Sequence, residues 1–280
     1  MTSVAVAGRA DLTDAQWAQL EPLLPRGKKA GRPPMWTKRQ LIDGIRWRTR
    51  VGCPWRDVPV AYGSWRAVYG LFRRWQRAGV WAMILKSLQV LANAAGEIVW
   101  QVSVDSTNAR AHQHAAGARR EGSRQAEPPH GPGECEPSDH GLGRSRGGWT
   151  SKLHLATEQG CRVLSVLVTA GQVGDSPQFT TVLDAIEVPR LGGGRARVRP
   201  ERVLADKAYS ARANRDWLRR HGIKATIPIP ADQAGHRHRR GSAGGRPPAF
   251  DPAIYRDRNA VERGLATIHI AVINQWLRHQ

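Results

Sequence analysis

The stretch from Val99 to Asn108 most constrains what this chain can fold into, because it predicts a partly buried strand that leads to an acid. Val102 and Val104 alternate with smaller polar residues, and β-branched residues at this spacing are typical of a pleated strand. The predicted strand ends on Asp105, and three residues that favour turns follow it. A lone acid in this place is more often a solvated strand end or a turn cap than a metal ligand. Its function therefore depends on whether other acids occur in similar settings.

A second short apolar run ends in the same way. Arg202–Ala205 predicts another strand, and Asp206 follows it with Lys207 at its side. Divalent metals such as Mg²⁺ are hard ions that take oxygen ligands, and a few carboxylates are enough because the ion keeps several waters. Two strands that each end on an acid, Asp105 and Asp206, therefore predict a metal site if a third carboxylate joins them.

The third carboxylate is predicted on a helix near the C-terminus, at about residues 253–277. Tyr255, Arg258 and Glu262 stand at positions i, i+3 and i+7, which places all three on one face of that helix. Taken alone, Arg258 and Glu262 would be an ordinary surface ion pair worth roughly a few tenths of a kcal/mol. Together with the two strand-end acids, Glu262 becomes the predicted third metal ligand.

The charge balance indicates a polyanionic partner. The 280 residues contain 43 Lys and Arg against 23 Asp and Glu, so the formal net charge is +20. No apolar run is long enough to span a membrane, and none is bounded like a signal peptide. The three cysteines are far apart and odd in number, which argues against a disulfide framework and against a zinc site. We therefore expect a soluble, cytoplasmic protein that acts on nucleic acid.

Residues 1–96 predict a small helical domain. Capping boxes begin helices at Thr13 and Thr37, and Ser64 begins a third helix whose aromatic residues recur at helical spacing. A Gly- and Pro-containing turn before such a basic helix is what a helix-turn-helix needs, although the basic face could equally be a solvated surface. The basic residues on this face are Arg66, Arg73, Arg74 and Arg77. Arg32 lies in a basic, extended segment at 26–36, which predicts either a solvated linker or an arm that follows DNA.

Residues 97–280 predict a second, α+β domain. After the first strand, residues 113–148 predict a polar loop that is too poor in aliphatic residues to order itself. A hairpin and a helix follow, and a further basic loop is predicted at about 231–249. The predicted order is β-β-β-α-β-α-β-α, with acids on strand one, strand four and the last helix. This order matches the ribonuclease-H-like architecture, in which a mixed sheet carries the acids.

The motifs resemble those of DDE transposases of bacterial insertion sequences, in the IS-five group. The resemblance covers nearly the whole chain and rests on several segments at once. These are Val104-Asp105-Ser106-Thr107 with Ala111-His112-Gln113-His114-Ala115 after it, Leu204-Ala205-Asp206-Lys207-Ala208-Tyr209, Tyr255-x2-Arg258-x3-Glu262, Leu12-Thr13-Asp14-x-Gln16-Trp17, and Cys53-Pro54-Trp55-Arg56-Asp57-Val58-Pro59.

This resemblance implies that Asp105, Asp206 and Glu262 are the catalytic, metal-binding residues, with two Mg²⁺ ions for which Mn²⁺ could substitute. It also implies that Tyr255 and Arg258 contact double-stranded DNA at the transposon end, and we expect a homodimer on the DNA. The implied reaction is hydrolysis at terminal inverted repeats, followed by attack of the freed 3′-hydroxyl on target DNA, at the nucleoid of a bacterial cytoplasm. The side chain of Lys207 and the basic helix are candidate phosphate contacts because of their own charge, not because of the resemblance.

One departure from the family pattern affects the last helix. Where the family has a Lys seven residues after the Glu, this chain has His269, and the tail that follows resembles the family's extreme C-terminus joined early. We interpret this as an internal deletion just after Arg263, which would impair transposition. Two other functions therefore stay open. One is a DNA-binding remnant that occupies transposon ends and represses transposition, and the other is a nuclease that cuts DNA strands but cannot join them.

Overall fold

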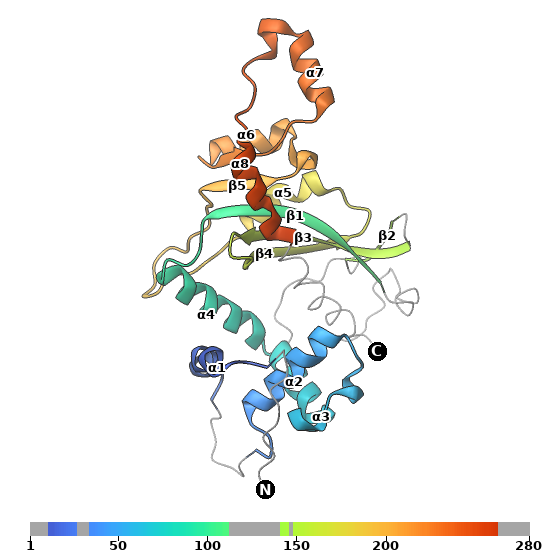
Figure 1. Ribbon diagram of the computed structural model, residues 1–280, viewed down its shortest axis with the longest axis vertical. Coiled ribbons are helices and arrows are strands. Elements are labelled where there is room, and N and C mark those ends of the chain that lie inside the picture. The colour runs from blue at the N-terminus through green and yellow to red at the C-terminus, as the bar shows by residue number, and fades with distance from the viewer. Residues whose placement is uncertain (1–10, 27–33, 112–140, 146–147, 263–280) are drawn as a thin grey trace. The chain divides into compact units, whose positions relative to one another are not determined.

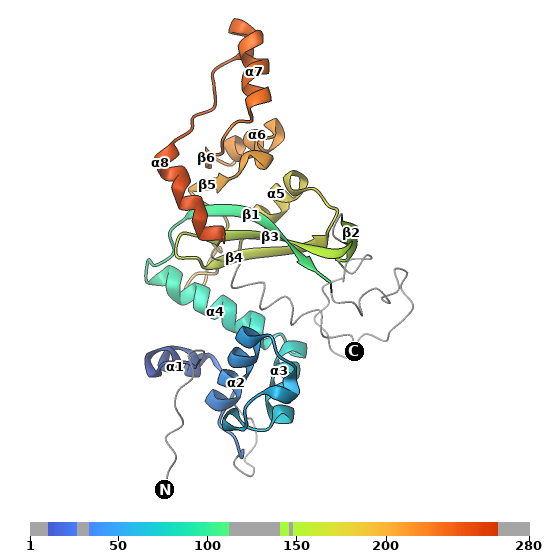
Figure 2. The same cartoon turned by 45° about the vertical axis from the view of Figure 1, so that its right-hand side comes forward.

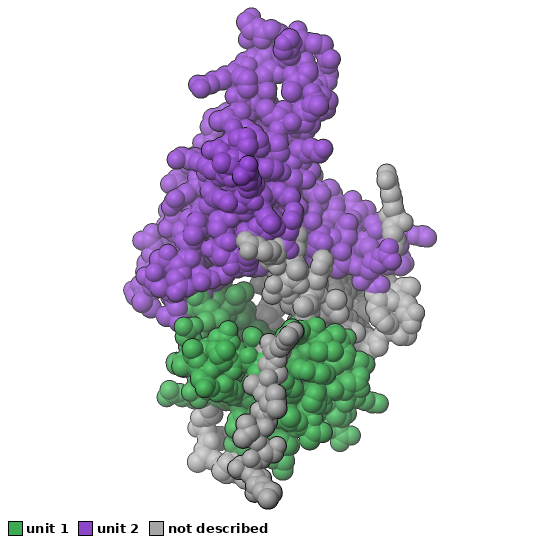
Figure 3. Space-filling model, viewed as in Figure 1, with its two compact units in different colours: residues 1–88, 124–135, 270–280 green, residues 89–123, 136–269 purple. Residues whose placement is uncertain are grey.

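The structure is a computed structural model and describes residues 11–26, 34–111, 141–145 and 148–262. Contacts within the chain divide it into two compact units, which Figure 3 colours separately. The described residues up to Leu88 belong to the first unit, and those from Gln89 onward belong to the second. This division falls inside one helix, α4 (Val80–Ala94). The domain boundary at residue 96 stays a prediction.

The first unit is built from helices, as the sequence predicts. Both predicted capping boxes are present, because the hydroxyls of Thr13 and Thr37 each accept a hydrogen bond at 3.2 Å from the backbone N–H three residues on. The first helix ends at Leu20 and continues as a 3-10 turn to Leu23. The elements are α1 (Asp14–Leu20), α2 (Lys38–Val51), α3 (Trp65–Arg77) and the start of α4, with 3-10 turns at Glu21–Leu23, Trp55–Asp57 and Val60–Tyr62.

Aromatic packing holds this first unit together. Trp55 lies between α3 residues, with its ring centroid 5.4 Å from that of Tyr69 and 5.0 Å from that of Phe72. Trp75 and Trp81 meet edge to face at 5.1 Å. Such pairs add roughly 0.5–1.5 kcal/mol each beyond the apolar area that they bury. The tryptophan-rich N-terminal sequence therefore forms the core of a helical unit.

A mixed sheet forms the centre of the second unit. Its strands run in the order β4-β3-β1-β5-β6, with the short β2 pairing on β3. β3 is antiparallel to β1 and to β4, whereas β5 is parallel to β1 and β6 is parallel to β5. This is the ribonuclease-H-like topology that was predicted. The strands are β1 (Gln101–Arg110), β2 (Gly143–Ser145), β3 (Gly148–Glu158), β4 (Val163–Ala170), β5 (Arg202–Ala205) and β6 (Lys224–Thr226).

Helices cover the two faces of this sheet (Figures 1 and 2). Val102 and Val104 of β1 point toward α5 (Asp175–Asp184) and α6 (Arg212–Arg220), and they share one buried core with both helices. Because successive strand side chains alternate between faces, the neighbouring Asp105 points to the opposite face. The helical segment that the structure describes up to Glu262 crosses that opposite face (Figure 1). It consists of α8 (Pro252–Tyr255), a 3-10 turn at Arg256–Arg258 and a further helical turn at 259–262.

β1 does not end where the sequence predicted. It continues past Asp105 to Arg110, because β3 is long enough to pair with it from Val102 to that residue. Only the pairing with β5 stops early, and its last row joins Val104 and Ala205. The turn-forming character of residues 106–108 is therefore overridden by the hydrogen-bonded ladder.

Two predicted loops also contain secondary structure. The basic segment at 231–249 was predicted as a loop, but it contains α7 (Ala231–Arg239) and a 3-10 turn at Gly241–Gly244. α7 contains no proline and no β-branched residue, so its backbone can be helical although none of its residues is buried. Part of the predicted polar loop at 113–148 forms β2, and residues 112–140 lie outside the described parts. The predicted helix beyond residue 262 lies outside them too. Within the described parts of the chain, none of the helices combines the length and the apolar composition that a membrane span requires.

Candidate active site

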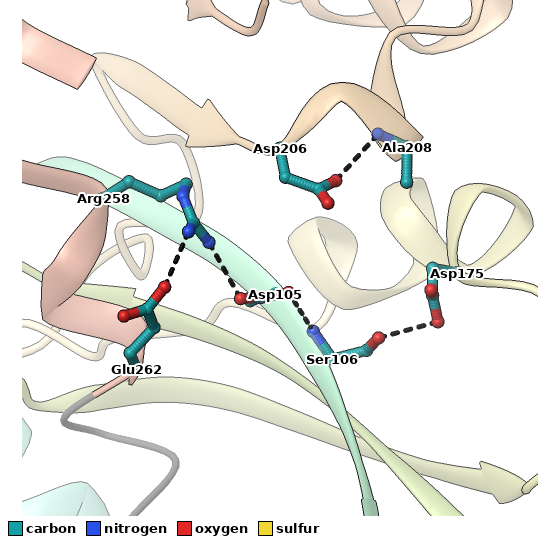
Figure 4. Close-up of polar contacts among 7 residues, drawn as sticks. All are labelled: Asp105, Ser106, Asp175, Asp206, Ala208, Arg258 and Glu262. Carbon is teal, nitrogen blue, oxygen red and sulfur yellow. Dashed lines mark hydrogen bonds and ion pairs between the residues drawn. The ribbon is translucent and has the colours of Figure 1, made fainter. Parts of the chain in front are cut away.

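The two aspartates that were predicted to bind metal lie side by side. Asp105 and Asp206 directly follow Val104 and Ala205, which form the last paired row of two adjacent parallel strands. They therefore reach the same edge of the sheet, and Figure 4 shows their carboxyl groups at that edge. Burial raises the pKa of the Asp105 carboxyl, and the nearby Asp206 carboxylate adds to that increase. The structure thus brings together two groups that are 101 residues apart in the sequence (206 − 105).

The Asp206 carboxylate also shapes the chain after β5. One of its oxygens accepts a hydrogen bond at 2.8 Å from the backbone N–H of Ala208, and this contact begins a 3-10 turn at Lys207–Tyr209. Tyr209 is buried and packs on Phe179 of α5, which fixes the turn against the core. Lys207 stays exposed and forms no ion pair with the described residues. Its predicted phosphate contact stays a prediction.

Arg258 joins two of the predicted catalytic acids. Its Nη1 lies 2.9 Å from Asp105 Oδ2, and its Nη2 lies 2.6 Å from Glu262 Oε1 (Figure 4). Burial acts to lower the pKa of Arg258, but the negative charges of Asp105 and Glu262 outweigh burial and raise it. The Tyr255 ring lies on the same segment, with its centroid 5.8 Å from the Arg258 guanidinium carbon. The one-face spacing that the sequence predicted is therefore realised in space.

The donor set decides which of these residues could hold a divalent metal. Asp105 and Asp206 offer adjacent carboxylate oxygens, the ligand type that such ions take. Glu262 lies on the other side of the Arg258 guanidinium, and no group of three or more His, Cys, Asp or Glu side chains within the described residues is placed to hold a metal. The two aspartates therefore supply two of the carboxylates that suit a divalent ion, while Asp105 Oδ2 is paired with Arg258. Glu262 can join them only if the guanidinium moves away.

Sequence reasoning missed a polar network next to Asp105. Asp175, at the start of α5, accepts a hydrogen bond from the Ser106 hydroxyl at 2.7 Å. It also forms an ion pair with Lys152 at 2.9 Å. Lys152 also donates to the carbonyl oxygen of Val173. Burial acts to raise the pKa of Asp175, but the hydrogen bonds from Ser106 and Lys152 outweigh burial and lower it. A lysine inside the apolar run of β3 was the one sequence signal for this network.

His154 is a buried neighbour of the same network. It lies opposite Ser106 in the β1–β3 ladder, and its Nε2 is 2.9 Å from the Thr169 hydroxyl. Its Nδ1 has no hydrogen-bond partner in the described parts of the chain. Burial lowers the pKa of His154 to about 4, so the ring is neutral near pH 7.

The predicted DNA-binding arginines of the first unit are placed as a helix face. Arg66, Arg74 and Arg77 are exposed on α3, and Arg73 is half-buried with its guanidinium 6.0 Å from the Tyr69 ring centroid. Arg32 lies outside the described residues. The structure also shows a buried arginine that the sequence reasoning missed. Arg48 of α2 stacks over the Trp55 ring at 4.8 Å.

Family models decide the relationship of this chain to known proteins. A model described as "Transposase DDE domain" matches residues 100–272, which is more than half of the chain. The chain belongs to the DDE transposase family. A second model, described as a putative transposase of the IS4/5 family, matches residues 12–85. This match covers most of the first unit. The predicted resemblance to the IS-five group is confirmed.

Three curated relatives match parts of this family member. It is 42% identical over 109 residues to an uncharacterized protein, y4sN, of Sinorhizobium fredii, which covers 39% of this chain and 83% of that protein. It is 35% identical over 108 residues to an uncharacterized 16.2 kDa protein of insertion element IS402 from Burkholderia cepacia, covering 36% of this chain and 73% of that one. It is 34% identical over 77 residues to a putative transposase for IS402 from the same organism, covering 28% and 36%.

Two solved structures of Mos1 also match the chain. The match to the Mos1 strand transfer complex covers 90% of this chain and 80% of the Mos1 chain, with 12% identity and a TM-score of 0.27. The Mos1 transposase paired-end complex with left transposon end covers 89% and 82%, with 12% identity and a TM-score of 0.26. The family assignment rests on the sequence models, and the ribonuclease-H-like fold rests on the observed strand order.

Proposed function

We propose that this DDE transposase family member binds the terminal inverted repeats of an insertion sequence, hydrolyses the DNA at their ends and transfers the freed 3′-hydroxyl to target DNA. One observation carries the proposal. Asp105 and Asp206 lie side by side at one sheet edge, and the segment with Tyr255, Arg258 and Glu262 crosses the same edge. Carboxylate oxygens that can bind metal and the cationic Arg258 thus lie together, on a protein whose net charge is +20.

The residues that would hold the metal are Asp105, Asp206 and Glu262, with Mg²⁺ as the expected ion and Mn²⁺ as a substitute. When bound, divalent ions would activate the attacking oxygen and stabilise the leaving oxygen in phosphodiester cleavage. The protein's own contribution is positioning. Arg258 lies beside the acids and can pair with a phosphate through its planar guanidinium, and Tyr255 can pack against the DNA next to it.

DNA binding by both units would serve the same function. We assign phosphate contacts to Lys207 beside Asp206 and to the α3 arginines of the first unit, together with Arg32. The second partner would be another copy of this chain, since an insertion sequence has two ends and each needs an active site. The reaction would take place on DNA in the bacterial cytoplasm.

The test of the chemistry uses the full chain and a linear DNA that carries the terminal inverted repeats. Asp105→Asn and Asp206→Asn should each abolish metal-dependent strand cleavage, because an amide cannot replace a carboxylate ligand. Asp232→Asn is the matched control, since Asp232 is exposed on α7 and forms no ion pair among the described residues. Normal cleavage by either active-site variant would contradict the assignment of Asp105 and Asp206 as catalytic metal ligands.

A second function is favoured by one specific contact. Arg258 stands between Asp105 and Glu262, so the three acids do not form one cluster. Together with the departure at His269, this contact favours a DNA-binding remnant that represses transposition. Binding of the inverted repeats without any metal-dependent cleavage would identify the repressor. Cleavage without joining of pre-cut ends to target DNA would instead identify a nuclease.

A further inference from the structure

A basic hollow lies in the second unit, at the opposite end of the parallel strands from the catalytic acids. It has a volume of about 860 Å³ and lies between the α5–β5 segment, the end of α6 and the start of β6. The strands β1, β5 and β6 begin there, in the row that joins Gln101, Arg202 and Lys224. Asp105 lies four positions further along β1 than Gln101 of that row, a distance of about 13 Å along the strand. The hollow is therefore separate from the candidate active site.

The segment between α5 and β5 forms one wall of the hollow as a small hairpin. Val188 and Arg197 exchange two backbone hydrogen bonds, at 3.0 and 2.8 Å, and the buried Val188 side chain anchors the hairpin to the core. Its tip is the run Gly192–Gly194, in which φ is between 84° and 93°, a conformation that favours glycine. This tip lets the chain reverse so that Arg190 on one arm and Arg195 on the other line the same hollow.

Cations outnumber anions around the hollow. Five cationic residues line it against two anionic ones, Asp184 and Glu201. Glu201 and Arg197 pair at 2.8 Å and cancel each other, which leaves four cations against one anion. The side chains of Arg190 and Arg195 are exposed and form no ion pair with the described residues. The five cationic residues are Arg190, Arg195, Arg197, Arg199 and Lys224.

Two of these cations are fixed in place. Arg197 stacks over the Trp100 ring at 4.0 Å, and Arg199 donates a hydrogen bond to the carbonyl oxygen of His221 at 3.2 Å. The hollow thus combines two anchored guanidinium groups with exposed cations at its rim. An arginine fork pairs well with phosphate oxygens, and exposed cations around an open hollow suit a continuous row of phosphates better than one enclosed small molecule.

We propose that this hollow is a second DNA-binding site, which holds backbone phosphates of DNA away from the bond that is cut. The proposal rests on the proposed function, because a transposase must hold both its own transposon end and other DNA, either the flank or the target. Phosphate contacts of this kind position DNA without reading its sequence.

The test is a salt titration with the full chain and a fluorescein-labelled 30-base-pair duplex of random sequence, followed by fluorescence anisotropy. Each lost phosphate contact lowers the slope of log K against log salt by about 0.9. Arg190→Gln/Arg195→Gln should lower that slope by about 2 and weaken binding roughly tenfold at low salt. Lys224→Gln, a single change at the start of β6, should lower it by about 1.

The matched control is Arg212→Gln/Arg219→Gln. These two arginines are also exposed in the second unit, but both pair with Asp216 on α6 outside the hollow, so the slope should stay near the wild-type value. An unchanged slope in both hollow variants, or an equal loss in the control, would overturn the proposal. Saturable binding of free AMP that only the hollow variants lose, with unchanged DNA binding, would also overturn it, since the hollow would then serve a small nucleotide. Asp105→Asn keeps the two proposals apart, because it should stop cleavage and leave the salt slope unchanged.

Discussion

Arg258 Nη1 lies 2.9 Å from Asp105 Oδ2, although 153 residues separate the two in the sequence. This ion pair places a positive charge at the edge where the aspartates of two adjacent strands meet. The same guanidinium holds Glu262, so one side chain connects a strand acid to the helix acid. It gives the acids a cationic partner that does not depend on a metal.

This ion pair predicts how the protein responds to divalent metal. Arg258→Gln should increase the rise in melting temperature that Mn²⁺ produces, because the competing cation is removed and Glu262 is released toward the aspartates. The same variant should melt at a lower temperature than wild type without metal, because Asp105 loses its partner. Thermal melts with and without Mn²⁺ measure both effects.

Arg256→Gln is the control for that experiment. Arg256 lies two positions earlier on the same segment, is exposed and forms no ion pair with the described residues, so its loss changes the net charge equally. An Mn²⁺ response in Arg258→Gln no larger than that of the control would contradict the expected competition.

The Ser106–Asp175–Lys152 network predicts a stability effect that is not additive. Lys152→Met should lower the free energy of unfolding by about 2 kcal/mol, because Asp175 keeps its charge and loses its ion pair in a mostly buried place. Lys152→Met/Asp175→Leu should cost less than the sum of the two single changes, since no uncompensated charge remains. Urea unfolding of the four proteins measures this coupling, and strict additivity would show that the two side chains act independently.

The buried His154 predicts a loss of stability in acid. Its pKa is about 4 in the folded chain and near 6.5 when the chain unfolds, so the unfolded state binds more protons between these values. The contribution of the neutral His154 ring to the free energy of unfolding is therefore fully present above about pH 6.5. This contribution falls as the pH drops toward 4, by about 3 kcal/mol in total.

His154→Gln isolates this effect from the carboxylates that titrate in the same range. The difference in unfolding free energy between wild type and variant should shrink as the pH falls from 6.5 to 4. A difference that stays constant across this range would mean that the ring does not stay neutral in the folded chain.

The arginine face of α3 predicts salt-dependent DNA binding by the first unit. Arg66→Gln/Arg74→Gln in the full chain should lower the slope of log K against log salt by about 2 for DNA carrying the inverted repeats. Arg46→Gln/Arg50→Gln removes the same charge from two exposed positions of α2, outside α3 and outside the basic segment at 26–36. Electrophoretic mobility shifts over a range of salt concentrations compare the two, and equal slopes in both would leave α3 without a special role.

Local sequence signals predicted a large part of the fold. The capping boxes at Thr13 and Thr37 begin helices as expected, because the contacts that form them join residues three apart. The apolar runs before Asp105 and Asp206 form adjacent parallel strands, which is what two buried β-branched segments in this order favour. The spacing of Arg258 and Glu262 placed them on one helix face for the same local reason.

Only the tertiary structure decided how those pieces meet. β1 continues to Arg110 because β3 pairs with it, and Asp175 reaches Ser106 from a helix 69 residues away. The pairing of Arg258 with Asp105 was also decided by the tertiary structure. Strand register and helix packing bring the two residues together, and no residue pattern near either position encodes their contact. The sequence by itself determined that two acids follow apolar strand segments and that a third lies on a helical segment. The packing of the sheet decided that Asp105 and Asp206 are neighbours and that Arg258 lies between Asp105 and Glu262.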